Sequence, residues 1–196
     1  MNILKKITRR KNKMELDTKR KQEIEEIASR KLKEFDLNTA GFDLIRFLQE
    51  KENFKIAWDN MEDDTTGFVI VNDEQDIPGT NSRKIIAINS NLLHEQFFIQ
   101  RRRFIVAHEY AHTQLHKKEK KLYAHRDISK KDTCEEKEAD FFASCFLMPK
   151  DLIKAQLQKE EVQKMEENRK IQYLAELFNV TIKKMKNRLL ELKYND

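Results

Sequence analysis

Apolar side chains recur three or four positions apart along much of the chain, a spacing that predicts amphipathic helices. Residues 15–35, for example, carry Ile24, Ala28 and Leu32 between charged residues. The predicted helices are residues 15–35, a helix that follows Asn38 or Thr39, residues 91–117 with a break before Arg101, residues 135–148, and two short helices within residues 168–193. Helices therefore account for most of the predicted structure.

Three short runs between these helices are rich in β-branched and aromatic residues. They lie at residues 54–58, 67–71 and 84–89, and a loop with Pro78 and Gly79 separates the last two. Such runs predict strands, so we expect a small sheet of about three strands. The order of helix, sheet and further helices indicates a mostly helical α+β fold.

Composition narrows the class of protein further. The chain has 196 residues, which suits one domain with at most a small appendage. It has only 3 Gly and 2 Pro, too little turn chemistry for a many-stranded β-sandwich. No run approaches the roughly 18 apolar residues of a membrane span, and the N-terminus lacks the apolar segment of a secretory signal. We therefore expect a soluble, cytoplasmic protein with no membrane partner.

The net charge of +5 is concentrated at the N-terminus. Residues 1–13 form a basic tail that contains no acidic residue, and the remaining chain is nearly balanced. Short basic tails are commonly just solvated. Charge alone therefore does not predict DNA binding.

The strongest candidate for chemistry is the sequence HEYAH at residues 108–112, an H-E-x-x-H motif within a predicted helix. His108 and His112 are four residues apart, so they lie on one helical face about 6 Å apart along the axis. Two imidazoles placed this way can converge on one zinc ion at about 2.1 Å each. Glu109 points to the side, where it can act as a base. Phe104 shares the histidine face, so we expect the pair to point into the protein.

A catalytic zinc usually has three protein ligands and one open position. The metzincin arrangement is excluded, because it requires Gly and His where this chain has Leu115 and Lys118. His116 lies one turn beyond His112, but it stands about 12 Å along the axis from His108, too far to share an ion. We therefore expect His116 to be a partly exposed residue at the helix end.

The third ligand is expected from the helix that follows. Glu136 and Asp140 lie one turn apart on the same side, where two like charges repel. The pair is favourable if Glu136 binds the metal while Asp140 holds a ligating histidine through its second nitrogen. Glu136 is therefore the predicted ligand, with Glu135 as the alternative. Glu138 is expected to project away from the apolar stripe, and Cys134 to be a bystander thiol.

Two segments closely resemble the ImmA/IrrE family of metallo-endopeptidases. They are RRRFIVAHEYAHTQLH at residues 101–116 and EEKEADFFASCFLMP at residues 135–149. The resemblance also covers a strand that ends in Asn89 and an earlier glycine such as Gly67. The Lys-rich connection at residues 117–134 departs from the family, so substrate contacts there cannot be carried over.

The resemblance implies a zincin-like core, similar to a minimal gluzincin, with an active-site helix. The expected organisation is a basic tail at residues 1–13, a zincin-like metallopeptidase domain at 14–150 and a helical segment similar to a helix-turn-helix at 151–196. The implied cofactor is one zinc ion, with manganese as an alternative. The implied substrate is a helix-turn-helix repressor of a phage, an integrative element or a stress regulon, whose cleavage relieves repression. An activating protein is a further candidate partner.

In the predicted mechanism Glu109 takes a proton from the attacking water and passes it to the leaving amine. A second group should stabilise the oxyanion, and Tyr123 and His125 are candidates because they lie nearby in the sequence. The strand at residues 85–89 is expected to pair with extended substrate backbone.

The C-terminal stretch IQYLAELFNVTIKKMKNRLLEL resembles a helix-turn-helix, with Ile182 among its predicted core residues. Its second helix is basic, which is also a feature of DNA-reading helices. We interpret the segment as a packing or substrate-docking element and do not expect direct DNA binding. The alternative hypothesis is a DNA-binding regulator with a structural or vestigial metal site. The basic residues of the second helix are Lys183, Lys184, Lys186 and Arg188.

Overall fold

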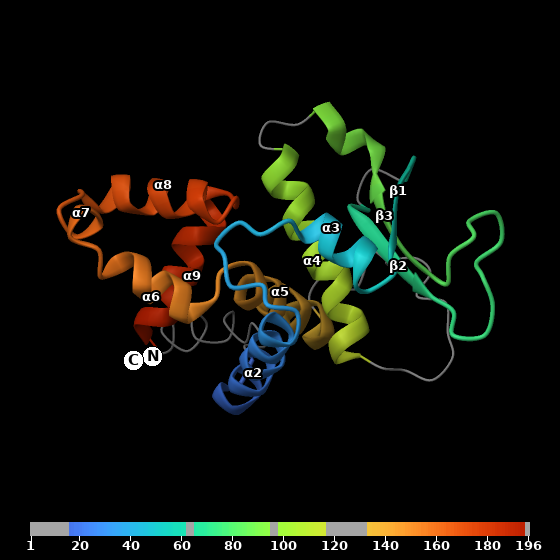
Figure 1. Ribbon diagram of the computed structural model, residues 1–196, viewed down its shortest axis with the longest axis horizontal. Helices are drawn as coiled ribbons and strands as arrows, with labels where there is room; N and C mark the ends of the chain where they lie inside the picture. Colours follow the sequence, from blue (N-terminus) through green and yellow to red (C-terminus); the bar gives the residue numbers. More distant parts are fainter. Residues whose placement is uncertain (1–15, 62–64, 95–97, 117–132, 195–196) are drawn as a thin grey trace, which may run out of the picture.

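The computed structural model describes residues 16–61, 65–94, 98–116 and 133–194, and it has a mostly helical α+β fold with one small sheet (Figure 1). The basic tail at residues 1–13 lies outside these ranges. In chain order the elements are α2 (Thr18–Glu34), α3 (Leu44–Glu50), β1 (Lys55–Asp59), β2 (Gly67–Val71), β3 (Lys84–Asn89), η2 (Ser90–His94), α4 (Phe98–Leu115), α5 (Cys134–Leu147), α6 (Lys150–Leu157), α7 (Glu160–Gln163), α8 (Glu167–Leu177) and α9 (Ile182–Tyr194). None of the helices in these ranges is long and apolar enough to cross a membrane.

Strand β3 lies in the centre of the sheet, parallel to β1 and antiparallel to β2. Residues 85–89 of this strand are all buried. The prediction that this strand pairs with substrate is therefore wrong, because β1 and β2 already occupy both of its hydrogen-bonding edges. Sequence order alone did not reveal that the last strand enters between the first two.

Strand β2 has a neighbouring strand on one side only, within the described part of the chain. Backbone hydrogen bonds join Asn89 to Thr66 and Asn72 to Arg83, which sets the alternation of the antiparallel ladder. The backbone groups of the odd-numbered residues of β2, from Gly67 to Val71, therefore point away from β3. They form the outer edge of the sheet.

Helix α4 connects the sheet to the helical part of the molecule, because it packs on β2 and β3 and also on α5 (Figure 1). Its residue Tyr110 is fully buried, and the ring of Tyr110 meets the rings of Phe47, Phe54, Phe142 and Phe146. Deletion of such a buried aromatic ring costs about 3–5 kcal/mol. This packing fixes the rotation of α4 and so determines which way the residues on its other sides point.

Helix α3 begins later than predicted, at Leu44 instead of directly after Asn38 or Thr39. The chain first turns at Gly41, whose φ is +70°, and a Cβ there would lie 2.7 Å from the carbonyl oxygen of Leu177. Only glycine tolerates both conditions without strain. Asp43 then caps the helix by accepting a hydrogen bond from the Arg46 amide.

The C-terminal helices share one core with the rest of the molecule. Helix α9 packs on α5, and its residues Met185 and Leu189 are buried in the main hydrophobic cluster. Ile182, in contrast, is 52% exposed, so its prediction as a core residue is wrong. Arg188 is 1% exposed, donates to the carbonyl of Met148 and pairs with Glu25 of α2. One of the four basic residues at positions 183–188 of this helix is therefore a core residue.

Candidate metal centre

His108 and His112 present their Nε2 atoms to the same point on one side of α4. These two atoms are 3.2 Å apart, and the rings meet edge to face with centroids 5.0 Å apart. Both side chains are largely withdrawn from solvent. The predicted convergence of the two imidazoles is therefore present in the fold.

Glu136 reaches the same point from the first turn of α5, where Thr133 caps the helix by accepting from the Glu136 amide. Its carboxylate oxygens lie 3.3 Å from His108 Nε2 and 3.3 Å from His112 Nε2. Glu135, the alternative, is exposed on the neighbouring helical position. Among the described residues, His108, His112 and Glu136 form a group that could hold a metal ion.

The spacing of the ligand atoms tests whether a zinc ion fits. A tetrahedral ion with bonds of about 2.0–2.1 Å holds its ligand atoms roughly 3.3 Å apart. Nε2 of His108 and Nε2 of His112 are 3.2 Å apart, and each lies 3.3 Å from a different carboxylate oxygen of Glu136. Two imidazole nitrogens and a carboxylate are also ligand types that zinc accepts in catalytic sites. The donor set and its dimensions therefore suit this ion.

Asp140 orients His108 through the other ring nitrogen, with Nδ1 2.8 Å from Oδ1 of Asp140. Because the carboxylate only accepts, Nδ1 carries the proton and Nε2 keeps its lone pair for a cation. Desolvation raises the pKa of Asp140, but the hydrogen bond from His108 and the charge of Lys184 outweigh it, so this pKa lies below its usual value. The role predicted for Asp140 agrees with this geometry.

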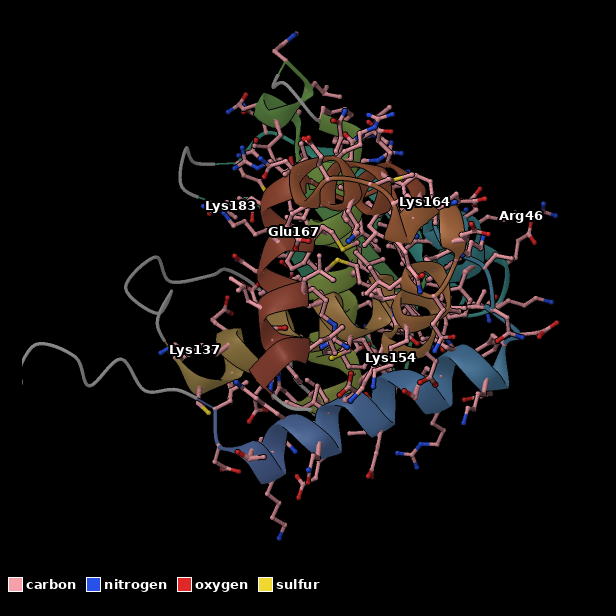
Figure 2. All side chains as sticks on the ribbon, turned by 90° about the vertical axis from the view of Figure 1, so that its left-hand side faces the viewer. Arg46, Lys137, Lys154, Lys164, Glu167 and Lys183 are labelled. Atoms are coloured by element: carbon pink, nitrogen blue, oxygen red, sulfur yellow. The ribbon has the colours of Figure 1, made fainter. Side chains whose placement is uncertain are left out.

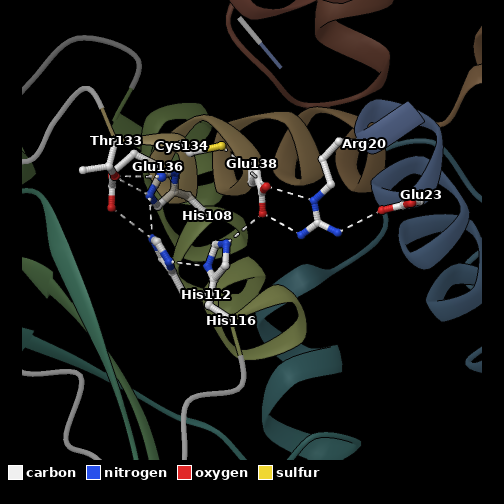
Figure 3. A network of polar contacts seen from close by, with 9 residues as sticks. All are labelled: Arg20, Glu23, His108, His112, His116, Thr133, Cys134, Glu136 and Glu138. Carbon is white, nitrogen blue, oxygen red and sulfur yellow. Dashed lines mark hydrogen bonds and ion pairs between the residues drawn. The ribbon is translucent and has the colours of Figure 1, made fainter. Parts of the chain in front are cut away.

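His116 and Glu138 both belong to a polar network that extends from the metal group (Figure 3). The His116 side chain is only 8% exposed, with its Nδ1 3.0 Å from Nδ1 of His112 and its Nε2 3.1 Å from Glu138. Glu138 is buried and accepts two hydrogen bonds from Arg20 of α2, at 2.9 and 2.6 Å. The expectation of an outward Glu138 is therefore wrong, whereas His116 lies at the helix end as expected but directs its side chain into the network.

The hydrogen bond from Arg20 lowers the pKa of Glu138, and this effect outweighs the desolvation that raises it. Burial lowers the pKa of His116 against the opposing hydrogen bond to Glu138. Arg20 also pairs with Glu23 at the surface. The sequence could have indicated that His116 belongs to this network, because it lies two helical turns after His108 on the same face. Nothing in the sequence near Arg20 indicated that it would take part.

Glu109 is 4% exposed and lies beside the first residue of the edge strand, Gly67. A Cβ at Gly67 would stand 2.8 Å from the carbonyl oxygen of Ala87, 2.9 Å from Ile105 and 3.6 Å from Cγ of Glu109. The glycine therefore allows β2 to approach α4 closely at this point. As a result, the candidate base and the first residue of β2 are neighbours.

Two further candidates cannot be placed beside this group. Tyr123 and His125 lie outside the described residues, so their proposed part in oxyanion stabilisation stays a prediction. Cys134 is exposed, and its thiol lies 3.7 Å from Glu138. The metal group found among the described residues does not include it.

Comparison with known proteins places these features in a family. The chain matches the family described as IrrE N-terminal-like domain, peptidase M78, over residues 50–190. Among curated proteins none matches the chain. A solved structure named "Mycobacterium tuberculosis transcriptional regulator" is similar in fold, with a TM-score of 0.50 and 17% identity over 85% of this chain and 46% of that one. This chain thus spans less than half of that protein, and the likeness concerns the fold alone. The family match extends over most of the sequence and includes both metal-group helices, so the chain belongs to the IrrE N-terminal-like peptidase M78 family, as its motifs predicted.

Proposed function

We propose that this protein is a zinc-dependent endopeptidase that cleaves a helix-turn-helix transcriptional repressor and so relieves repression. The observation that carries the proposal is the convergence of His108, His112 and Glu136, with the buried Glu109 next to His108 in the sequence. Membership in a peptidase family supports peptide-bond hydrolysis. The class of substrate rests on the resemblance of the two motifs to ImmA/IrrE endopeptidases.

Zinc is the metal that this group favours over manganese. Manganese prefers six ligands in an octahedron, mainly oxygens, whereas two of the three candidate ligands here are imidazoles. A bound zinc ion supplies Lewis-acid polarisation of the scissile carbonyl and activates a water molecule for attack.

The residues of the chain supply the remaining chemistry. Glu109 accepts a proton from the attacking water and delivers it to the nitrogen of the leaving amine. Asp140 keeps His108 in the tautomer whose Nε2 can bind the metal. The outer edge of β2, beginning at Gly67, replaces β3 as the proposed place where extended substrate backbone pairs.

The rival function is a DNA-binding regulator whose metal site is structural. A structural zinc site normally closes with a fourth protein ligand and has no use for a base. Here three candidate ligands converge, and the buried carboxylate of Glu109 follows directly on the first of them. These features support the peptidase over the regulator.

The decisive experiment incubates the purified protein with the helix-turn-helix repressor encoded beside its gene, with and without a zinc chelator. We expect about one zinc per chain and two repressor fragments by intact-mass analysis. The Glu109→Gln variant should retain zinc but lose cleavage by a factor of about 10²–10⁴ or more, because an amide cannot take the proton. Glu135→Gln, an exposed neighbour of the site, is the matched control and should cleave normally.

The outcomes separate the parts of the proposal. Cleavage that survives the chelator, or that is unchanged in Glu109→Gln, would remove the metallopeptidase mechanism. Cleavage of a generic peptide but not of the repressor would leave the mechanism intact and overturn the substrate. Zinc retention without cleavage of either would favour the regulator.

A further inference from the structure

The two candidate histidine ligands are oriented by different kinds of group. His108 donates from Nδ1 to a carboxylate, that of Asp140. His112 instead directs Nδ1 to another imidazole, that of His116, at 3.0 Å, with the two ring centroids 5.1 Å apart. The function proposed above makes no use of this second contact.

These side chains form a hydrogen-bond network that runs from His112 to Arg20. The direction of each hydrogen bond in it follows from the outer end, at Glu138. The carboxylate of Glu138 is bound by the guanidinium of Arg20 through two hydrogen bonds, so it is ionised and can only accept. His116 Nε2, at 3.1 Å from this carboxylate, must therefore be the donor. In a neutral imidazole the other nitrogen is then an acceptor, so His116 Nδ1 accepts.

The same direction is required from the metal end. If His112 binds a cation through Nε2, its proton must be on Nδ1, which then donates. His116 Nδ1 is positioned to accept that proton, so the assignment from Glu138 and the assignment from the metal agree. Every donor in the network therefore meets an acceptor without any change in protonation.

The three outer members of the hydrogen-bond network come from three segments that are distant in sequence. His116 directly follows α4, Glu138 belongs to α5 and Arg20 belongs to α2 (Figure 3). Burial of His116 and Glu138 withdraws the contacts from competing water. The packing of α2 against α5 is thereby coupled to the orientation of one imidazole at the metal group.

We propose that His116 is a positioning residue of the metal centre, which holds the tautomer and ring orientation of His112 and is itself held by Glu138 and Arg20. This inference rests on the proposed function only in taking His112 as a zinc ligand. Loss of such a partner of a metal-bound histidine typically weakens metal binding by 10–100-fold. The alternative is that the network only joins α2, α4 and α5 mechanically.

Two isosteric substitutions distinguish these roles. The Oδ1 of an asparagine occupies nearly the place of histidine Nδ1, so His116→Asn keeps an acceptor for His112. A glutamine instead carries its polar atoms near the place of Nε2, so His116→Gln keeps the contact with Glu138 and loses the one with His112. Zinc affinity is measured by competition with a chromophoric chelator, and the unfolding of the metal-free variants by circular dichroism. His94→Gln, at an exposed histidine, is the control.

We expect His116→Gln to bind zinc about tenfold or more weakly, and His116→Asn and His94→Gln to bind within a few-fold of wild type. Equal affinities in both His116 variants, whether normal or reduced, would overturn the proposal. Normal zinc binding by all variants with intact peptidase activity would overturn this inference and leave the proposed function standing. Absence of zinc binding by the wild-type protein would instead overturn the proposed function.

A measurement on the wild-type protein keeps the proposal testable if the variants do not fold. Long-range ¹H–¹⁵N correlation spectra report which nitrogen of each imidazole carries a proton. In the zinc-loaded protein we expect His116 protonated at Nε2 only and His112 protonated at Nδ1. A proton on His116 Nδ1 would overturn the proposal, because that nitrogen could not then accept from His112.

Discussion

The ammonium group of Lys184 lies 3.6 Å from the carboxylate of Asp140, which in turn binds His108. The same ammonium lies 3.4 Å from the centroid of the Phe104 ring on α4. A residue of the last helix is therefore in direct contact with the residue that orients a candidate metal ligand. From the sequence, no residue after Asp140 was expected to contribute to the metal site. In the fold, Lys184 of α9 also contributes, through its contact with Asp140.

Replacement of Lys184 by methionine should weaken zinc binding modestly. The substitution keeps an unbranched stem against Phe104 but removes the charge that helps to fix Asp140. Because Asp140 is 55% exposed, the pair is worth at most about 1 kcal/mol, which corresponds to no more than about a fivefold loss of affinity. A competition titration measures this effect, with Lys183→Met on the outer face of α9 as control. Identical affinities of the two variants would show that the ion pair contributes nothing.

The choice of third ligand is tested by two adjacent alanine substitutions on α5. Glu136→Ala removes a carboxylate 3.3 Å from each histidine Nε2 and should lower zinc affinity by at least a factor of ten. Glu135→Ala removes an exposed carboxylate of the same kind and should leave affinity within a few-fold of wild type. Metal content after dialysis and affinity by competition measure both. The reverse pattern would move the ligand by one residue.

The stability contributed by Glu138 should depend on pH in a definite direction. The hydrogen bond from Arg20 holds the folded-state pKa of Glu138 below its usual value. Its contribution is therefore complete above the unfolded pKa of about 4.3 and is lost as the pH falls through the lower folded pKa. Glu138→Gln should destabilise the protein by about 1–3 kcal/mol at pH 7, and the deficit should shrink as the pH is lowered from 5 to 3.

Urea unfolding of the metal-free proteins across this pH range measures that deficit. Glu23→Gln is the control, because it removes the surface partner of Arg20 and leaves the bonds to Glu138 in place. We expect this control to remain close to wild type at every pH. A deficit of Glu138→Gln that stays constant down to pH 3 would contradict the assignment of an ionised, stabilising carboxylate.

Much of the site was predictable because its signals are local. The spacing of His108 and His112 on one helix, and the unfavourable pair of Glu136 and Asp140 on another, indicated the convergence that the fold contains. The network beyond them was not predictable in this way. The helical projection of α5 placed Glu138 outside the apolar stripe, and nothing near it in sequence indicated that Arg20 would cover it.

In the small sheet, too, local features were predictable from the sequence and contacts between distant segments were not. All three strand segments were predicted within one residue of their observed bounds, since β-branched runs are a local signal. The order of the strands in the sheet was not predicted, because it depends on which strand pairs with both of the others. Helices α6 and α7 were predicted only as part of a helical segment at residues 151–196, without bounds of their own. They are short, and α7 buries only Val162, too few apolar positions to show a period.

Deletion of residues 168–196 should unfold the protein, which favours packing over docking, the two roles that the sequence left open for this segment. The deletion removes buried side chains such as Phe178, Met185 and Leu189 from the shared core and leaves Glu25 without its arginine. Each large buried side chain contributes about 2–5 kcal/mol, so the sum exceeds a typical total stability of 5–15 kcal/mol. Thermal unfolding and cleavage of both a short peptide and an intact repressor measure this. A folded truncation that still cleaves the peptide would restore the interpretation of a separate docking segment.

Helix α9 should not read DNA, because the fold uses half of its predicted cations internally. Arg188 is buried against Glu25 and Lys184 faces Asp140, whereas Lys183 and Lys186 remain at the surface, with Lys183 directed away from the helical body (Figure 2). Two phosphate contacts would make affinity fall only about tenfold between 50 and 200 mM salt, compared with about 10³–10⁵ for proteins that make six to ten contacts. We therefore expect no sequence-specific complex with the repressor's operator in fluorescence anisotropy at physiological salt, relative to a scrambled duplex. Specific binding that disappears when both surface lysines are changed to glutamine would instead support the regulator hypothesis, because it would require this helix to contact the duplex.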